Sequence, residues 1–369
     1  MRSLENLVQR FNDVPNPRRT DCGNFKYSTS SILTCSFCAI MAGYHGARSI
    51  TDFMRDNYTI LNLIVGLPFG VPSHDTITRV LSNVDPQRVA DICREWAGIN
   101  KLTPEFLQTD GKTIRGSKEN GEKTVHIVSV YAQDFAASLL EKQVCEKENE
   151  ILAFEQILLS NQIDFQGKTV TGDAMFCQRS FCKSIVEGGG DWVFVLKKNQ
   201  PTLFQSVEEY WKNKEATETK VISISGHGRK GTKTIRFTTD VDWINKDFNF
   251  PGLSCIAEVV TTVKEKGVVK TSTQYLIGSV KTLEKLFIAR SKHWGIETMH
   301  YILDLAFEEN RCRDRTGSAP LTLNIFRKIS HYFFEMAKKL KEYKEYSTRR
   351  LMDRCKAKFY TLLKILSLS

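Results

Sequence analysis

Hydrophobic residues recur at helical spacing through the first quarter of the chain. Between residues 27 and 54, apolar side chains fall three or four positions apart, which is the spacing of one face of an α-helix. Ser73 stands just before a run of the same period that starts at Thr76, so it predicts a helix N-cap. Residues 89–96 form another amphipathic segment. These patterns predict a helical N-terminal domain over residues 1–98.

After residue 99 the pattern changes to short runs of apolar and β-branched residues. Such runs predict strands at residues 106–110, 124–131, 137–144, 167–173 and 192–196. Helical spacing separates the later strands, at residues 150–162 and 178–187. Three strands followed by helix, strand, helix and strand is the order of an RNase H-like α/β core. The fold class predicted here is therefore α/β with a mixed sheet.

A second β-rich stretch interrupts this order. Within residues 206–285, several runs alternate or are rich in β-branched side chains, with Gly and Lys between them. Helical spacing returns near Leu283 and continues to the region of Leu340. The pattern predicts an α/β domain over residues 99–340, interrupted by a β-rich insertion, and then a tail at 341–369.

The composition is that of a globular protein, with 41% hydrophobic and 25% charged residues. The longest apolar stretches carry polar residues, and none resembles a membrane span of roughly 20 apolar residues. The first residues of the chain lack the apolar segment of a signal peptide. We therefore expect a cytoplasmic protein without a membrane partner.

The net charge of +10 favours a polyanionic partner. Much of it lies in residues 338–369, where ten Lys and Arg face three acidic residues and leave +7. A solvated helix face is a common explanation of such a run. Phosphate binding becomes the better explanation only if other residues indicate a nucleic-acid enzyme.

Ten cysteines are scattered along the chain. Cys35 and Cys38 form a lone CxxC inside an apolar, helix-like run, and no second pair stands at zinc-binding spacing. The pattern is typical of reduced thiols in a hydrophobic core, and we expect no zinc site.

Two acidic residues stand at the ends of predicted buried strands. Asp110 follows residues 106–109, and Asp173 follows residues 167–172. Strand ends are where an α/β sheet exposes functional side chains, and a carboxylate there needs solvent or a cation. A turn-forming Asp before Gly explains Asp110 about as well as catalysis does. A turn explains Asp173 less well, because Ala-Met-Phe follows it rather than a turn-forming residue such as Gly.

A third carboxylate has to come from the helix predicted beyond residue 291. Its more apolar face holds Ile296, Met299, Leu303 and, by core packing, Trp294. The carboxylates of Glu297, Asp304 and Glu308 are all eligible by pattern, and a solvated charged face is the alternative for each.

Three oxygen ligands suit hard divalent cations such as Mg²⁺. Two such ions can activate a water or a 3′-hydroxyl and stabilise the leaving oxygen in phosphodiester chemistry. His293 and His300 do not have the H-E-x-x-H spacing of a zinc site. The chain also lacks GxGxxG, GxxxxGK[ST] and GxSxG motifs, which argues against nucleotide-cofactor, P-loop and serine-hydrolase chemistry.

Motifs along nearly the whole chain resemble those of DDE transposases from the insertion-sequence group related to the H-repeat-associated proteins. They are NPR at 16–18, GVPSHDTITR at 70–79, DGKTIRGS at 110–117, DAMFCQ at 173–178, LKKNQPT at 196–202, HGR at 227–229, VDW at 241–243, HWGIE at 293–297 and LDLAFEE at 303–309. Each motif alone is weak, but their order and spacing together are specific.

The resemblance implies an RNase H-like catalytic domain in which Asp110, Asp173 and Glu297 are the catalytic, metal-binding carboxylates. It implies a metal-dependent endonuclease and strand transferase that uses two Mg²⁺ ions, which Mn²⁺ could replace. The partners it implies are the terminal inverted repeats of the element and target DNA, bound by a homodimer through the N-terminal region and the basic tail. Residues expected near the DNA phosphates or the Asp173 loop are Lys112, Arg115, Gln178, Lys197, Asn199, Arg311 and Arg313.

The chain departs from the family pattern at several positions. Thr298, Gly231 and Asn310 replace a usual Asn, Glu and acidic residue. Where transposases that cut through a DNA hairpin carry Tyr, Arg and Lys, this chain has Arg290, His293 and Asp304. Two alternatives therefore stay open: a catalytically silent or domesticated DNA-binding remnant, and a stand-alone RNase H-like nuclease.

Overall fold

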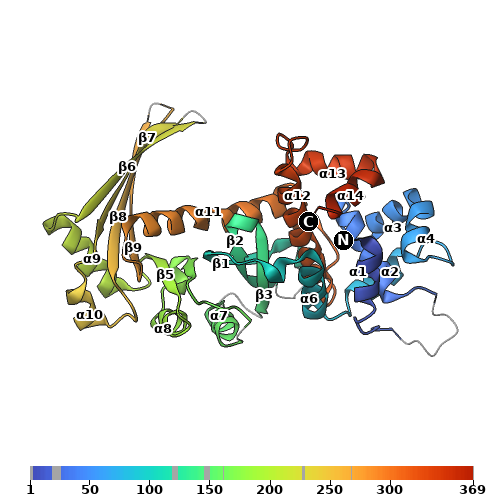
Figure 1. Cartoon of the computed structure of the whole chain (residues 1–369), viewed down its shortest axis with the longest axis horizontal. Coiled ribbons are helices and arrows are strands. Elements are labelled where there is room, and N and C mark those ends of the chain that lie inside the picture. The colour runs from blue at the N-terminus through green and yellow to red at the C-terminus, as the bar shows by residue number, and fades with distance from the viewer. Residues whose placement is uncertain are drawn as a thin grey trace. The chain divides into compact units, whose positions relative to one another are not determined.

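The computed structural model describes residues 3–18, 26–118, 124–144, 150–160, 162–226, 229–266 and 268–368 (Figure 1). His227 and Gly228 of the HGR motif lie outside this set. The chain divides into two compact units. The first comprises Met1–Thr103, Gly111–Glu150 and Gly295–Ser369, and the second comprises Pro104–Asp110 and Ile151–Trp294.

The helices predicted for the N-terminal region are present in the first unit. They are α1 (Leu4–Phe11), α2 (Thr29–Met41), α3 (Ala47–Asp56), α4 (Tyr58–Val65), α5 (His74–Leu81) and α6 (Pro86–Ala97), followed by the short 3₁₀ helix η1 (Ile99–Lys101). Ser73 caps α5 as predicted, because its Oγ accepts a hydrogen bond from the backbone N–H of Thr76 at 3.3 Å.

The core of the first unit forms around α2 and the C-terminal helix α12 (Ala319–Lys338). The ring of Phe37 meets Trp96 and Phe326, each at a centroid distance of 5.8 Å. Cys35 and Cys38 are fully buried in this core, where burial raises the pKa of both thiols. Their predicted role as core thiols is confirmed.

The basic tail is also helical, with α13 (Thr348–Ala357) and α14 (Phe359–Leu366). Leu351, Met352 and Ile365 are buried in the core of the first unit, whereas Lys356 and Lys358 are exposed. Within the described residues, no helix is long and apolar enough to cross a bilayer.

The described part of the chain contains nine strands in the hydrogen-bonded order β3-β2-β1-β4-β5-β9-β8-β7-β6. In the first unit, β2 (Val125–Ala132) pairs antiparallel with β3 (Ala137–Val144). In the second, β4 (Thr169–Gly172) pairs in parallel with both β1 (Phe106–Ile114) and β5 (Asp191–Leu196). This mixed sheet confirms the predicted RNase H-like α/β class.

The β-rich stretch of the second unit is an antiparallel ribbon, drawn as the long arrows in Figure 1. It consists of β6 (Glu218–Gly226), β7 (Arg229–Thr238), β8 (Cys255–Glu265) and β9 (Val268–Gly278), and β9 joins it to β5. The helices of this unit are α7 (Glu150–Leu159), α8 (Arg179–Glu187), α9 (Pro201–Asn213), α10 (Asp242–Phe248) and the first part of α11 (Leu283–Leu305).

Two expectations on local structure were wrong. β1 does not end at Asp110 but continues to Ile114, because Lys112 and Ile114 alternate with less buried residues and keep the backbone extended. Within the range predicted for the β-rich insertion, the residues up to Asn213 belong to α9. Trp294 does not pack in the core: its side chain is 65% exposed, whereas Ile296, Met299 and Leu303 are buried as predicted.

Candidate active site

Asp110 and Asp173 lie on neighbouring parallel strands, one residue beyond a matched pair. The β1–β4 register aligns Thr109 with Gly172, so the next residue on each strand is an aspartate. The hydroxyl of Thr109 donates to the carbonyl of Thr171 at 3.0 Å, and both threonines are buried. This pairing places the two aspartates next to each other where β4 ends, although β1 continues beyond Asp110.

The turn that follows β4 leaves little room around Gly172. A Cβ at this position would lie 2.6 Å from the Thr109 Oγ1 and 3.0 Å from the Phe176 ring. Only glycine therefore lets β4 approach β1 so closely and then turn into η5 (Ala174–Phe176), which starts directly after Asp173. Asp173 remains 48% exposed, so its carboxylate is accessible to a ligand.

The ring of His293 lies next to the carboxylate of Asp173. Its side chain is only 2% exposed, and its Nε2 lies 3.9 Å from the Asp173 Oδ1. Its Nδ1 lies 3.1 Å from the Oγ1 of Thr171, so β4 orients the ring. Sequence reasoning weighed His293 only as a zinc ligand and missed this position. The available signal was its place in α11, one helical turn before Glu297.

The loop after β5 is tied to the loop that carries Asp173. The Asn199 Nδ2 donates to the carbonyl of Ala174 at 2.7 Å, and the Gln200 Nε2 donates to the carbonyl of Cys177 at 3.2 Å. Gln178 donates through its Nε2 to the carbonyl of Met175 at 3.2 Å. These amides hold the backbone that follows Asp173. Lys197, in the same loop, is exposed.

Lys112 is not on the surface. Its ammonium is 8% exposed and lies 2.6 Å from the Asp304 Oδ1 and 3.6 Å from the Glu309 Oε2, all within the first unit. Burial alone would raise the pKa of Glu309, but Arg327 and Lys112 hold it below its ordinary value. Lys112 therefore neutralises carboxylates of the protein, in contrast to the expectation that it faces DNA phosphates.

Arg115, Arg311 and Arg313 are all exposed, on two segments of the first unit that touch each other. The backbone N–H of Arg115 donates to the Asn310 Oδ1 at 3.1 Å. A Cβ on Gly116 would lie 2.7 Å from the carbonyl of Cys312, so glycine allows the close approach. The structure therefore brings these three predicted cations onto one surface.

All three eligible third carboxylates lie in the first unit. Asp304 binds Lys112, and Glu308 lies 3.3 Å from Arg311 and 3.2 Å from Arg349. Glu297 is half-buried on the part of α11 that belongs to the first unit, whereas Asp110 and Asp173 belong to the second.

Within the described ranges, no three His, Cys, Asp or Glu side chains are grouped at metal-binding spacing. Asp110 and Asp173 could supply two hard oxygen ligands, and a Mg²⁺ site would need more.

Comparison with known proteins gives consistent results. Residues 101–323 match the model of the transposase DDE domain, and residues 8–97 match the DDE_Tnp_1-associated domain. The chain is 30% identical over 343 residues to "Putative transposase YncI" of Escherichia coli, covering 89% of this chain and 87% of that protein. It is 29% identical over 332 residues to "H repeat-associated putative transposase YhhI" of the same species, covering 86% of each. A piggyBac transposase solved in a synaptic complex with hairpin DNA superposes with a TM-score of 0.47 at 11% identity, over 98% of this chain and 76% of that one.

Proposed function

The chain belongs to the transposase DDE domain family, and on that premise we propose that it cuts DNA at the ends of an insertion sequence and joins those ends to target DNA. The observation that carries the proposal is the β1–β4 register, which sets Asp110 and Asp173 side by side with an accessible carboxylate. We assign residues 1–98 to a helical DNA-associated domain, 99–340 to the catalytic domain with its β-rich insertion at about 206–285, and 341–369 to a basic tail.

Asp110, Asp173 and Glu297 would together hold two divalent cations. The choice of Glu297 over Asp304 and Glu308 rests on the family resemblance. Mg²⁺ or Mn²⁺ bound there would activate the attacking oxygen and stabilise the leaving one. Carboxylates at a sheet edge suit such hard cations better than the buried thiols of the chain do.

In the first reaction a water oxygen attacks a phosphodiester at the end of the element. The bond from phosphorus to the 3′-oxygen breaks, and the 3′-oxygen takes up a proton. In the second reaction that 3′-hydroxyl attacks a phosphodiester of target DNA, loses its proton, and displaces another 3′-oxygen. His293 acts as a positioning residue, because its buried ring limits the directions that the Asp173 carboxylate can take.

The exposed side chains Lys197, Arg115, Arg311 and Arg313 would contact DNA phosphates. Asn199 and Gln178 would act on DNA indirectly, through the loop that they hold. The N-terminal helices and the basic tail would bind the terminal repeats, with the protein acting as a homodimer in the cytoplasm.

Replacing Asp173 with Asn tests the proposal. The amide keeps the shape of the side chain but removes a charge that two cations require. We expect Asp173→Asn to slow cleavage of DNA carrying the cognate ends by at least about 100-fold with Mg²⁺ or Mn²⁺, at unchanged DNA affinity. Asp164→Asn, which alters an exposed carboxylate of the same unit, is the matched control and should cleave normally. Normal cleavage by Asp173→Asn would exclude the mechanism.

A DNA-binding protein without catalytic activity is the second candidate. The departures from the family pattern at Gly231, Thr298 and Asn310 favour it. The same assay separates the two, because in this case the unaltered protein would bind the ends and cut with neither metal.

A further inference from the structure

Positive charge is concentrated at one end of the antiparallel ribbon of the second unit. This is the end where β6 and β8 finish and β7 and β9 begin. Residues 230–233 and 264–270, which lie there, include five lysines and one glutamate. Figure 1 draws this end of the ribbon beyond α9 and α10. None of the residues assigned above to catalysis or DNA binding lies in these two segments.

Lys230 and Lys264 lie directly opposite each other on β7 and β8. Both side chains are exposed, and neither forms an ion pair with another residue that the structure describes. Like charges directly opposite each other on neighbouring strands are destabilising. The ribbon therefore holds a pair of cations that a bound anion would stabilise.

The two lysines share one face of the ribbon with a row of hydroxyl groups. Each strand of the ribbon pairs with its neighbour without a shift in register, so side chains alternate between the two faces and directly opposite residues share a face. Two residues along from the lysines, the row on their face consists of Ser223, Thr232, Thr262 and Thr271. Ser223, Thr232 and Thr271 are exposed. Neither this row nor the row of the two lysines contains an aspartate or a glutamate.

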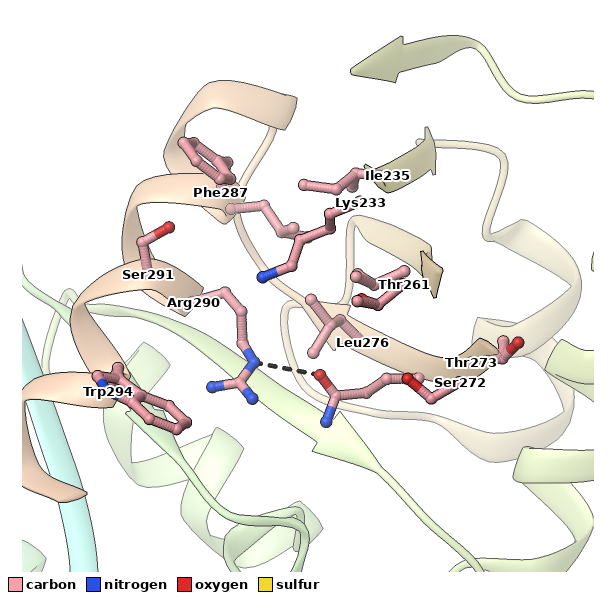
Figure 2. Close-up of a pocket in the computed structure, with 13 residues that line it drawn as sticks. Lys233, Ile235, Thr261, Ser272, Thr273, Leu276, Phe287, Arg290, Ser291 and Trp294 are labelled. Carbon is pink, nitrogen blue, oxygen red and sulfur yellow. Dashed lines mark hydrogen bonds between the residues drawn. The ribbon is translucent and has the colours of Figure 1, made fainter. Parts of the chain in front are cut away.

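The other face of the ribbon is directed towards α11. Figure 2 shows Lys233 and Thr261 of that face beside Trp294 of α11, around a cavity of about 550 Å³. Neither Lys230 nor Lys264 lines this cavity. The face that carries these two lysines is therefore directed away from α11 and open to a partner.

We propose that this face, which we call the ribbon platform and define by Lys230, Lys264, Thr232 and Thr271, binds the phosphate backbone of duplex DNA. The inference rests on the proposed function, because that function supplies the DNA. Ammonium groups form strong charge-assisted hydrogen bonds with phosphate oxygens and release counterions, and hydroxyl groups donate to the same oxygens. Four strands about 4.8 Å apart span about 14 Å, which is more than the width of about 12 Å of the major groove. The platform therefore contacts phosphates rather than base edges.

Duplex binding by the full chain in EDTA tests the proposal. Without a divalent metal ion no strand is cut, so a failure of the cleavage mechanism cannot affect the result. We expect Lys230→Gln with Lys264→Gln to weaken binding roughly tenfold, equally for the cognate ends and for a scrambled duplex, and to reduce the slope of log Kd against log salt by about two. Lys230→Arg with Lys264→Arg should keep both values.

Lys246→Gln with Lys281→Gln is the matched control. It removes two exposed charges from the same unit, but at the other end of the ribbon, where α10 follows β7 and where β9 finishes. Affinity and salt slope should stay nearly unchanged in this variant. Urea denaturation separates binding from folding: because Lys230→Gln with Lys264→Gln removes two like charges that face each other, its unfolding midpoint should equal or exceed that of the unaltered protein.

Acetylation of lysines, followed by mass spectrometry, gives a readout without any substitution. Duplex DNA should protect Lys230 and Lys264 from acetylation but not Lys246 and Lys281. An unchanged salt slope in the Lys230 and Lys264 double Gln variant, or an equal weakening in the control variant, would overturn the proposal. Weakening for one duplex sequence alone would also overturn it, and so would protection of the two platform lysines by polyglutamate but not by duplex. An unaltered protein that binds no duplex would instead contradict the proposed function, and the inference with it.

Discussion

In the first unit, Lys112 lies against Asp304 and Glu309, Arg327 lies 3.4 Å from Glu309, and Lys328 lies 3.3 Å from Glu141. In the second unit, Lys233 on β7 is half-buried and faces a cavity whose described lining holds no carboxylate. The cations of the first group have carboxylates of the protein against them, whereas the described lining of the cavity offers Lys233 none. Sequence composition alone does not distinguish Lys233 from the first group, since all of these residues are Lys or Arg near apolar residues.

The difference has an energetic consequence. Removing one partner of a buried ion pair leaves the other charge uncompensated, which is strongly destabilising. Lys233 has no carboxylate against it in the described lining of its cavity, and its charge is disfavoured chiefly by burial, so removing that charge should not destabilise the fold. The same substitution should therefore have different effects on stability in the two units.

The largest expected effect comes from Lys112→Met. It leaves Glu309, which is fully buried, with fewer cations around it, although Arg327, Asn324 and Lys328 remain, and it should lower the free energy of unfolding by about 3 kcal/mol. Lys233→Met keeps the aliphatic part of its side chain and should change stability by less than about 0.5 kcal/mol, with an increase favoured. Urea denaturation followed by circular dichroism measures both. A loss of stability in Lys233→Met as large as in Lys112→Met would remove the distinction between Lys233 and the first group.

A smaller effect concerns pH and Lys328. Burial lowers the pKa of Lys328 to about 7, although the carboxylate of Glu309 acts in the opposite direction. The ordinary value of 10.5 applies to the unfolded chain, so between these two values the unfolded state binds more protons than the folded state. Stability should therefore rise with pH above about 7, by at most about 1.4 kcal/mol per pH unit, and the penalty should be complete below pH 7.

Lys328→Met removes this titration. Unfolding midpoints in urea between about pH 7 and pH 8.5 should rise with pH in the unaltered protein and stay nearly flat in the variant. The window stops there because burial raises the pKa of thiols such as Cys35 and Cys93, and these would lower stability at higher pH. Parallel pH profiles for the two proteins would show that Lys328 keeps its proton when folded.

The fold followed from local patterns wherever an element buries one continuous face. The strands at residues 124–131 and 192–196 are short and apolar, and the structure places both almost where they were predicted. β1 was predicted too short because Gly111 and Lys112 have low strand propensity. The carboxylates that accept Lys112 come from residues about 190 positions later in the chain, which no local pattern can show.

The candidate site was predictable to a similar degree. Two aspartates next to short apolar strands are visible in a sequence, because strand pattern and residue type are both local, although only β4 ends at its aspartate. His293 beside Asp173 is not, since it depends on how α11 packs against β4. Asn199 was expected near DNA and instead donates to the backbone after Asp173, because a loop amide can reach either partner. Trp294 was expected inside the protein, but its side chain is exposed. It lies beside the buried face of α11, which Ile296, Met299 and Leu303 form.

The smallest expected effect extends the comparison to a surface where no burial is involved. Lys356 and Lys358 are exposed in the tail, and the Lys356 ammonium lies 4.6 Å from the centroid of the Tyr44 ring. If the tail binds phosphates, Lys356→Met with Lys358→Met should weaken duplex binding a few-fold for all sequences, and should reduce the salt slope by about one unit for each phosphate that the variant no longer neutralises.

Lys364→Met is the control in the same tail, because Lys364 already has Glu342 at 2.7 Å and its charge is balanced within the protein. Fluorescence anisotropy at several salt concentrations measures all three proteins. Their unfolding midpoints in urea should agree closely, because exposed charges and one exposed cation–π pair contribute little to stability. An unchanged salt slope in the double variant would mean that the tail is a solvated helix that does not bind phosphates. An equal weakening of duplex binding in Lys364→Met would mean that total charge, rather than charge without an internal partner, governs binding.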